Sequence, residues 1–133
     1  MAAKIIHVIG KRKKATARLT LKPGHGKIKV NQVFLDNCTY PILKLKMQEP
    51  LLLAGDILKD IDLDINVNGG GVNGQAEAVR LALARALAQY DKKLEKVFEV
   101  YDRQLLVADV RRKETRKPGR RSKARAKTQK SYR

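Results

Sequence analysis

The sequence has few of the residues that build covalent cross-links, metal centres or aromatic stacking surfaces. Its 133 residues include one cysteine, two histidines, two phenylalanines and no tryptophan. One cysteine excludes an internal disulfide framework and the paired cysteines of a zinc site, and we expect Cys38 to be a small buried hydrophobe. We therefore expect no metal site and no redox chemistry.

Long apolar runs are also absent. The longest ones, such as residues 51–54, are far shorter than the roughly 20 residues needed to cross a bilayer. The start of the chain, Met-Ala-Ala-Lys, is not followed by the apolar stretch of a secretory signal. These absences predict a soluble cytoplasmic protein with no membrane partner.

Acidic residues are scarce, and they are scarcest at the C-terminal end of the chain. The formal net charge is +17, from 30 Lys and Arg against 13 Asp and Glu. Residues 111–133, called the basic tail below, hold 12 of the cations and one acid, so they carry +11 of that charge. A segment this polar cannot bury enough apolar surface to fold alone. We therefore predict a globular domain at 1–110, a tail at 111–133, and a polyanionic partner, with nucleic acid first and an anionic membrane second.

Apolar residues, on both faces of residues 4–9 and alternating in three later segments, predict strands in the first half of the domain. The expected strands are residues 4–9, 15–22, 28–30 and 61–68. A turn signal at Pro23–Gly26 predicts that residues 15–30 form one hairpin, with one apolar and one basic face. Gly10 is expected to open a loop that contains four consecutive cations.

Helical spacing dominates the second half. Pro41 suits the first turn of a helix that Pro50 should stop or kink, and residues 51–58 should be helical in part. An alanine-rich helix is expected at 76–90, with Arg80 and Arg85 exposed. A second helix should be capped by Asp91 and bury the residues at helical spacing, namely Leu94, Val97, Phe98 and Tyr101. The predicted fold is α/β, as a two-layer α+β domain: helices cover a sheet of about four strands that contains an antiparallel hairpin.

The glycine-rich segment before that helix satisfies the spacing of a nucleotide-binding loop, because Gly69, Gly71 and Gly74 match G-x-G-x-x-G. A P-loop would need lysine and a hydroxyl residue where Gln75 and Ala76 stand. A dinucleotide fold would need several further strand–helix units, and too little chain remains for them. A tight strand-to-helix connection is the preferred interpretation, so we expect neither a cofactor nor enzymatic activity.

The cations themselves are the candidate binding site. The loop after Gly10 is either a solvated basic loop or a phosphate clamp, and the net charge favours the clamp. An extended tail of 23 residues reaches roughly 75 Å, a length that suits a large folded RNA better than a naked duplex. We expect contacts with RNA phosphates from Lys11, Arg12, Lys13, Lys14, Arg18, Arg111, Arg112, Arg116, Lys117, Arg120, Arg121, Lys123, Arg125 and Lys127. A general DNA-binding protein and a nucleotide-dependent enzyme are the rival classes.

Several blocks of sequence resemble one known family. They are Gly-Lys-Arg-Lys-Lys-Ala-Thr-Ala-Arg at 10–18, Gly-Gly-Gly-Val-Asn-Gly-Gln-Ala at 69–76, Leu-Leu-Val-Ala-Asp at 105–109, and Gln-Lys-Ser-Tyr-Arg at 129–133. Together they are similar to the universal S-nine family of small-subunit ribosomal proteins. The ending resembles the archaeal and eukaryotic branch.

The resemblance implies a βββαβα domain with a left-handed crossover that binds the rRNA of the small-subunit head, close to neighbouring head proteins. It further implies that the tail reaches the peptidyl site. There Arg133 would approach the anticodon-stem phosphates of the bound tRNA, with Lys130 and Tyr132 nearby. On this basis we expect a structural constituent of the ribosome that acts in translation.

Overall fold

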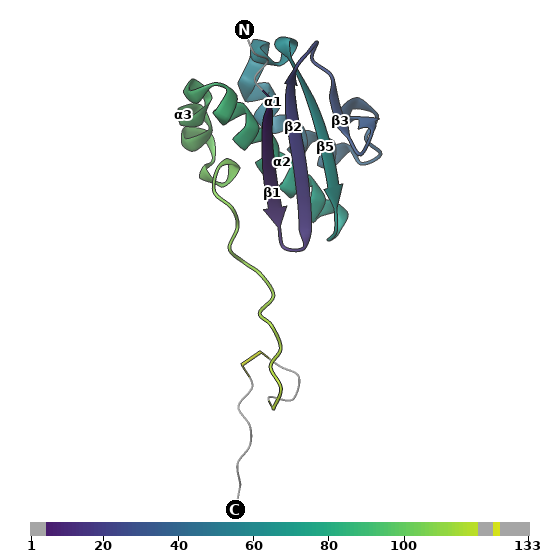
Figure 1. Cartoon of the computed structure of the whole chain (residues 1–133), viewed down its shortest axis with the longest axis vertical. Coiled ribbons are helices and arrows are strands. Elements are labelled where there is room, and N and C mark those ends of the chain that lie inside the picture. Colours follow the sequence, from purple (N-terminus) through teal and green to yellow (C-terminus); the bar gives the residue numbers. More distant parts are fainter. Residues whose placement is uncertain (1–4, 120–123, 126–133) are drawn as a thin grey trace, which may run out of the picture.

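Five strands form one mixed sheet in the order β1-β2-β5-β3-β4 (Figure 1). The computed structural model describes residues 5–119 and 124–125. Only β3 and β5 run parallel, and the other neighbours are antiparallel. The strands are β1 (Ile6–Arg12), β2 (Ala15–Pro23), β3 (Ile28–Val30), β4 (Val33–Phe34) and β5 (Ile61–Asn68).

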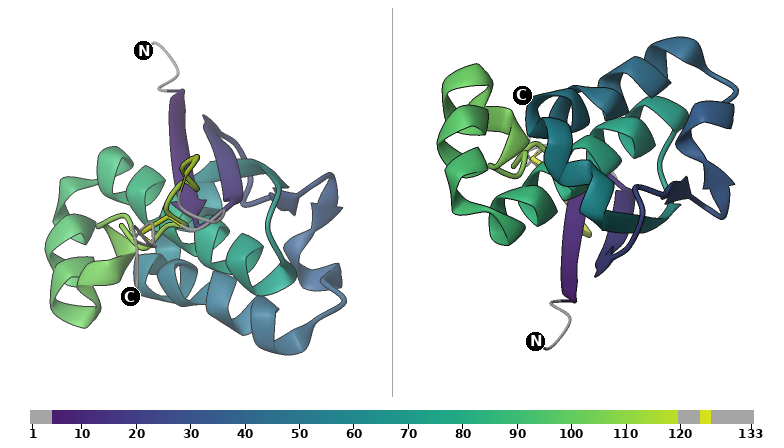
Figure 2. Two further views of the ribbon diagram at one scale, coloured as in Figure 1. Left: turned by 90° about the horizontal axis from the view of Figure 1, so that it is seen from below. Right: turned by 90° about the horizontal axis from the view of Figure 1, so that it is seen from above.

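Three helices pack on one side of this sheet: α1 (Pro41–Ala54) and α2 (Val72–Tyr90) lie behind it, and α3 (Lys92–Tyr101) lies beyond its β1 edge (Figure 1). Helix α2 lies across β1 and β2, α1 packs beside α2, and α3 packs against α2 on the β1 side (Figures 1 and 2). Short 3-10 turns span Leu35–Asn37, Gly55–Asp60 and Arg103–Leu105. The predicted α+β class with helices over a sheet is therefore confirmed.

Strict alternation along the strands creates the core. Leu19, Leu21, Leu63 and Ile65 are buried beneath the helices, while their neighbours along the strands point to the open face. Fully burying a leucine contributes about 1.5–3 kcal/mol, so these strands are held by one continuous apolar layer. The open face of the sheet is thereby left to polar side chains.

The predicted hairpin at residues 15–30 is wrong, because β5 lies between β2 and β3. Eight consecutive residues of β5 pair with β2, whereas β3 has only three residues to offer. Because β5 forms the longer ladder, β5 and not β3 lies beside β2. The turn after β2 is instead tied to β5, where the Asp62 carboxylate accepts hydrogen bonds from the amides of His25 (2.8 Å) and Lys27 (2.9 Å).

Several element boundaries also differ from expectation. The sheet has five strands rather than four, and α1 continues past Pro50 to end at Ala54, followed by Gly55, whose φ of 59° suits a glycine. Helix α2 begins at Val72, four residues earlier than expected. Val97 and Tyr101 on α3 are exposed rather than in the core, although Leu94 and Phe98 are buried as predicted. The handedness of the crossover stays a prediction.

Candidate nucleic-acid interface

Three exposed lysines lie at the end of the β1–β2 hairpin. Strand β1 continues through Gly10 to Arg12, so the cations expected in a long loop are mostly held by a strand and a tight turn. Arg12 pairs with Ala15, and Lys13 between them has a φ of 54°. We call Lys11, Lys13 and Lys14 the hairpin tip; all three are exposed.

On the open face of the sheet, positive charge without an acid opposite it lies near that tip. Arg18 is exposed there, between Ile9 on β1 and Asn66 on β5, with no acid opposite it. Farther along the strands, Lys22 is opposite Asp62, so the charges there compensate one another. A polyanion would therefore be attracted to the tip end of the face.

The glycine-rich connection between β5 and α2 packs against this hairpin. Gly69 and Gly70 have φ values of 77° and 66°, which favour glycine. A Cβ added to Gly69 would lie 2.5 Å from the carbonyl oxygen of Lys14, so only a glycine lets the backbones approach this closely. The connection is thus the tight strand-to-helix turn that we expected, and it brings the start of α2 beside the hairpin tip.

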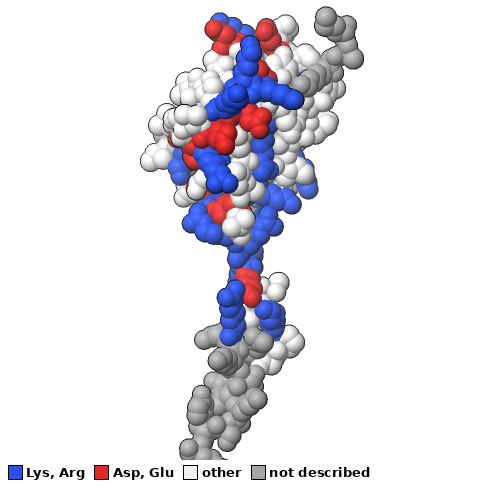
Figure 3. All heavy atoms as spheres, turned by 90° about the vertical axis from the view of Figure 1, so that its left-hand side faces the viewer, with Lys and Arg blue, Asp and Glu red and all other residues white. Residues whose placement is uncertain are grey.

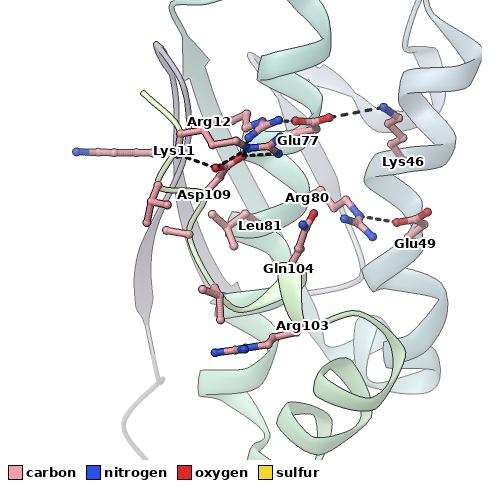
Figure 4. Close-up of a pocket in the computed structure, with 14 residues that line it drawn as sticks. Lys11, Arg12, Lys46, Glu49, Glu77, Arg80, Leu81, Arg103, Gln104 and Asp109 are labelled. Atoms are coloured by element: carbon pink, nitrogen blue, oxygen red, sulfur yellow. Dashed lines mark hydrogen bonds and ion pairs between the residues drawn. The ribbon is translucent and has the colours of Figure 1, made fainter. Parts of the chain in front are cut away.

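Arg12 differs from its neighbours because its side chain is only 17% exposed. It pairs with Glu77 of α2, with 2.5 Å between Nε and Oε2, and with Asp109 at the end of the domain. Lys46 of α1 lies 3.8 Å from the second oxygen of Glu77 (Figure 4). The contact of Arg12 with RNA stays a prediction, and the structure gives this residue internal partners.

The same ion pairs line an open cleft of about 930 Å³ between α1, α2 and the segment that leads to the tail (Figure 4). Arg80, which lines this cleft, and Arg85 are both half-buried, although we expected both to be exposed. Arg80 bridges Glu49 (2.5 Å) and Asp102 (3.0 Å), and Arg85 donates to the carbonyl of Leu106 (2.9 Å). Both arginines hold the chain after α3 against the rest of the domain.

Asp102 illustrates how this segment is fixed. Its carboxylate accepts a hydrogen bond from the amide of Gln104, which lowers the pKa of Asp102, and the Arg80 guanidinium lowers the pKa further. The carboxylate thus caps the 3-10 turn at Arg103–Leu105 and pairs with α2 at once. Leu105 is fully buried, so the chain is anchored just before the tail begins.

The beginning of the tail leaves the domain at this point (Figure 1). Residues 111–119 contain no helix or strand and are all exposed. Lys and Arg side chains gather at this end of the domain and continue along the tail (Figure 3). The described tail residues of the predicted site are Arg111, Arg112, Arg116, Lys117 and Arg125.

Glu114, the one acid of the tail, lies 3.0 Å from Lys117 and 2.6 Å from Arg125. The other predicted tail contacts lie outside the described residues: Arg120, Arg121, Lys123, Lys127, Lys130, Tyr132 and Arg133. Their assignments stay predictions.

The described part of the chain contains neither a metal-binding cluster nor a membrane-spanning helix. Among residues 5–119 and 124–125, no group of three or more His, Cys, Asp or Glu could hold a metal ion. In the same residues, no helix is long and apolar enough to cross a membrane.

The residues that the sequence reasoning missed are the acids of the cleft. Glu77 and Asp109 each contact Arg12, yet Glu77 belongs to no motif, and Asp109 was noticed only as the end of the 105–109 block. The available signal was local: Asp109 is the only acid between Asp102 and Glu114 in the sequence, two residues before a run of cations.

Comparison with known proteins gives a consistent result over the whole chain. A family model described as "Ribosomal protein S9/S16" matches residues 10–133. The chain is 48% identical over 133 residues to "Small ribosomal subunit protein uS9" of Methanococcus maripaludis (strain C5), covering 98% of this chain and 99% of that protein. A protein of the same name from Methanothrix thermoacetophila is 46% identical over 132 residues, again covering 98% and 99%. The similarity includes the domain and the tail alike.

Proposed function

The chain belongs to the ribosomal protein S9/S16 family, and from that premise we propose that it is a structural constituent of the small ribosomal subunit. It is a non-enzymatic protein of translation, and its place is the cytoplasmic ribosome. The observation that carries the proposal is a family match from residue 10 to residue 133 in a chain whose charge is +17. Such a charge suits permanent association with RNA phosphates.

The domain binds the rRNA of the subunit head through the hairpin tip. Lys11, Lys13, Lys14 and Arg18 are exposed at one end of the β1–β2 hairpin, and neither Lys11 nor Arg18 has an acid opposite it, which supports a contact with the phosphate backbone. The rigid turn limits how much entropy these side chains lose when RNA binds. Arg111 and Arg112 extend the cationic surface toward the tail.

The tail continues along rRNA and ends at the peptidyl-site tRNA. Its predicted rRNA-binding cations, which begin at Arg111 and end at Lys127, neutralise rRNA phosphates along the path, while Lys130, Tyr132 and Arg133 contact the tRNA. Guanidinium groups bind phosphate oxygens in a bidentate geometry that is independent of nucleotide sequence. A contact of this kind suits a site that must accept every tRNA.

Other proteins of the subunit head are further partners. Helix α1 exposes Ile42 (73%), Leu45 (63%) and Leu52 (78%) on the side away from the core. These apolar side chains are unsuited to phosphates and suit a protein surface instead.

The first test is co-sedimentation of the tagged protein from cell extract in salt high enough to remove loosely held basic proteins. We expect stable migration with the small subunit. Release into the light fractions would contradict the proposal and would direct attention to general DNA binding, which equal affinity for duplex DNA and rRNA would indicate.

A charge reversal then tests the hairpin tip. Lys14→Glu should weaken binding to small-subunit rRNA and reduce the slope of log K against log salt by about 1 or more. Lys59→Glu is the matched control, because Lys59 is exposed just before β5, at the opposite end of the sheet from the tip. Equal effects of both changes would contradict a specific role of the tip.

A further inference from the structure

Five charged side chains of alternating sign connect the body of the domain to the first residue of the tail. Their order, through successive ion pairs, is Lys46, Glu77, Arg12, Asp109 and Arg111. They come from α1, α2, β1 and the end of the domain. The pairs up to Asp109 join segments that are far apart in the sequence, and the last pair, Asp109–Arg111, lies at the tail junction. Figure 4 shows Asp109 and Glu77 converging on the Arg12 guanidinium.

Asp109 is the member of this series that joins the body of the domain to the tail. Its Oδ1 accepts a hydrogen bond from the backbone amide of Arg111 (2.8 Å), which fixes the local turn. Its Oδ2 contacts both the Arg12 guanidinium and Nη2 of Arg111, the latter at 3.0 Å. One carboxylate therefore sets the backbone and a side chain at the tail junction while it is tied to β1.

The partners on the body side are held firmly. Arg12 is 17% exposed and lies in the last position of β1, paired in register with Ala15. Its Nε is bound to Glu77 of α2, so the guanidinium cannot rotate away without breaking that pair. An ion pair anchored at both ends loses little side-chain entropy and is stronger than an ordinary surface pair.

Arg111 remains available although it is paired. Its side chain is 71% exposed, compared with 20% for Asp109. Asp109 thus orients the Arg111 guanidinium at the surface, where a phosphate oxygen can still approach its open side. A preoriented guanidinium loses less freedom on binding than a free one.

We infer that Arg12 and Asp109 are positioning residues that set the direction in which the tail leaves the domain. The inference rests on the proposed function, in which the tail must start from a fixed point to reach a distant site. When the tail starts from a fixed point beside the hairpin tip, the residues that follow sample a smaller volume. Their effective concentration at the rRNA is therefore higher. Breaking the Arg12–Asp109 pair releases this constraint without removing any exposed cation of the tip or the tail.

A distance measurement on the free full-length protein tests the inference. Spin labels are attached to Asn66→Cys, on the open face of β5, and Lys113→Cys, in the tail, in a Cys38→Ala background. Pulsed electron paramagnetic resonance then gives the distribution of distances between the two labels. Asp109→Asn should broaden it clearly, because the isosteric amide can still accept the hydrogen bond from the Arg111 amide but loses the charge that pairs with Arg12.

Two further variants make the result specific. Arg12→Gln should also broaden the distribution, and the double variant should add little more, since both changes remove the same Arg12–Asp109 pair. Asp56→Asn is the control, because this exposed residue pairs with Lys59 at the far end of the sheet. Circular dichroism shows whether each variant retains the fold. An unchanged distribution in Asp109→Asn, or additive broadening in the double variant, would overturn the inference.

The consequence for translation is measured separately. In reconstituted small subunits, Asp109→Asn should weaken peptidyl-site tRNA binding by roughly two- to fivefold. The effect should vanish when residues 130–133 are also deleted. Broadened distances with unchanged tRNA binding would leave the positioning role in place and contradict the proposed tRNA contact, so the two ideas can fail independently.

Discussion

Replacing Gly10 with alanine is expected to destabilise the domain strongly. Gly10 lies within β1, where the strand touches the backbone of α2. An added Cβ would lie 2.1 Å from the carbonyl oxygen of Ala78, 2.8 Å from the amide nitrogen of Ala82 and 3.0 Å from its Cβ. Carbon contacts are optimal at about 3.5–4.0 Å, so α2 would have to move away from β1 by roughly 1 Å or more.

The expected loss of folding stability is the balance between the higher strand propensity of alanine and the cost of overpacking. Alanine gains roughly 0.5–1 kcal/mol over glycine inside a strand. Overpacking typically costs about 1–3 kcal/mol, and here the obstacle is helix backbone that cannot rotate aside. Moving α2 also loosens its contacts with β1 and β2, so we expect a net loss near 3 kcal/mol. That is a large share of the 5–15 kcal/mol that usually stabilises a domain.

Guanidinium chloride unfolding, followed by helical circular dichroism, measures this loss. Gly74→Ala is the matched control: its added Cβ would lie 3.6 Å from the Cβ of Ala15, an ordinary contact, in the first turn of α2. It should be neutral or stabilise by up to about 1 kcal/mol. If Gly10→Ala unfolds within 0.5 kcal/mol of the parent, about the error of such measurements, the close packing of β1 on α2 is wrong.

Two further predictions concern a turn and a helix cap. Backbone amides of Lys27 and His25 lower the pKa of Asp62 below its usual 3.8, so this carboxylate stabilises the fold above that pH, and the contribution is lost as pH falls through the lowered pKa. The stability difference between the parent and Asp62→Asn should therefore shrink below about pH 4, and a carboxyl NMR titration should show the low pKa; an unshifted titration would contradict the turn geometry. Asp91→Ala removes the cap that accepts from the Lys93 amide (2.9 Å) and should cost about 1 kcal/mol in denaturant unfolding, whereas Asp91→Asn should cost little.

The strands and helices were largely predictable because their periodicity is strong. Alternation from Ala15 to Lys22 and from Ile61 to Asn68 placed β2 and β5 almost to the residue. Pairing was not predictable in the same way, because it depends on competition between distant segments. The local signal at Pro23–Gly26 indicated a hairpin, yet β5 forms a longer ladder with β2 and lies beside it instead.

The candidate site was predictable only where charge itself was the signal. Lys11, Lys13 and Lys14 are exposed, and the run of four cations was enough to single them out. Arg12 belongs to the same run but points inward, because strand alternation and two carboxylates from elsewhere in the fold decide its environment. A residue's charge is visible in the sequence, whereas its partners depend on the tertiary structure.

The central claim is that the end of the tail supports tRNA in the peptidyl site. Deleting residues 130–133 tests it most directly, in small subunits reconstituted with the shortened protein. We predict that these subunits sediment normally, because the domain and the remaining tail cations are intact, and that their affinity for peptidyl-site tRNA falls. Unchanged affinity in correctly assembled subunits would contradict the account, and failed assembly would show that these four residues serve rRNA binding instead.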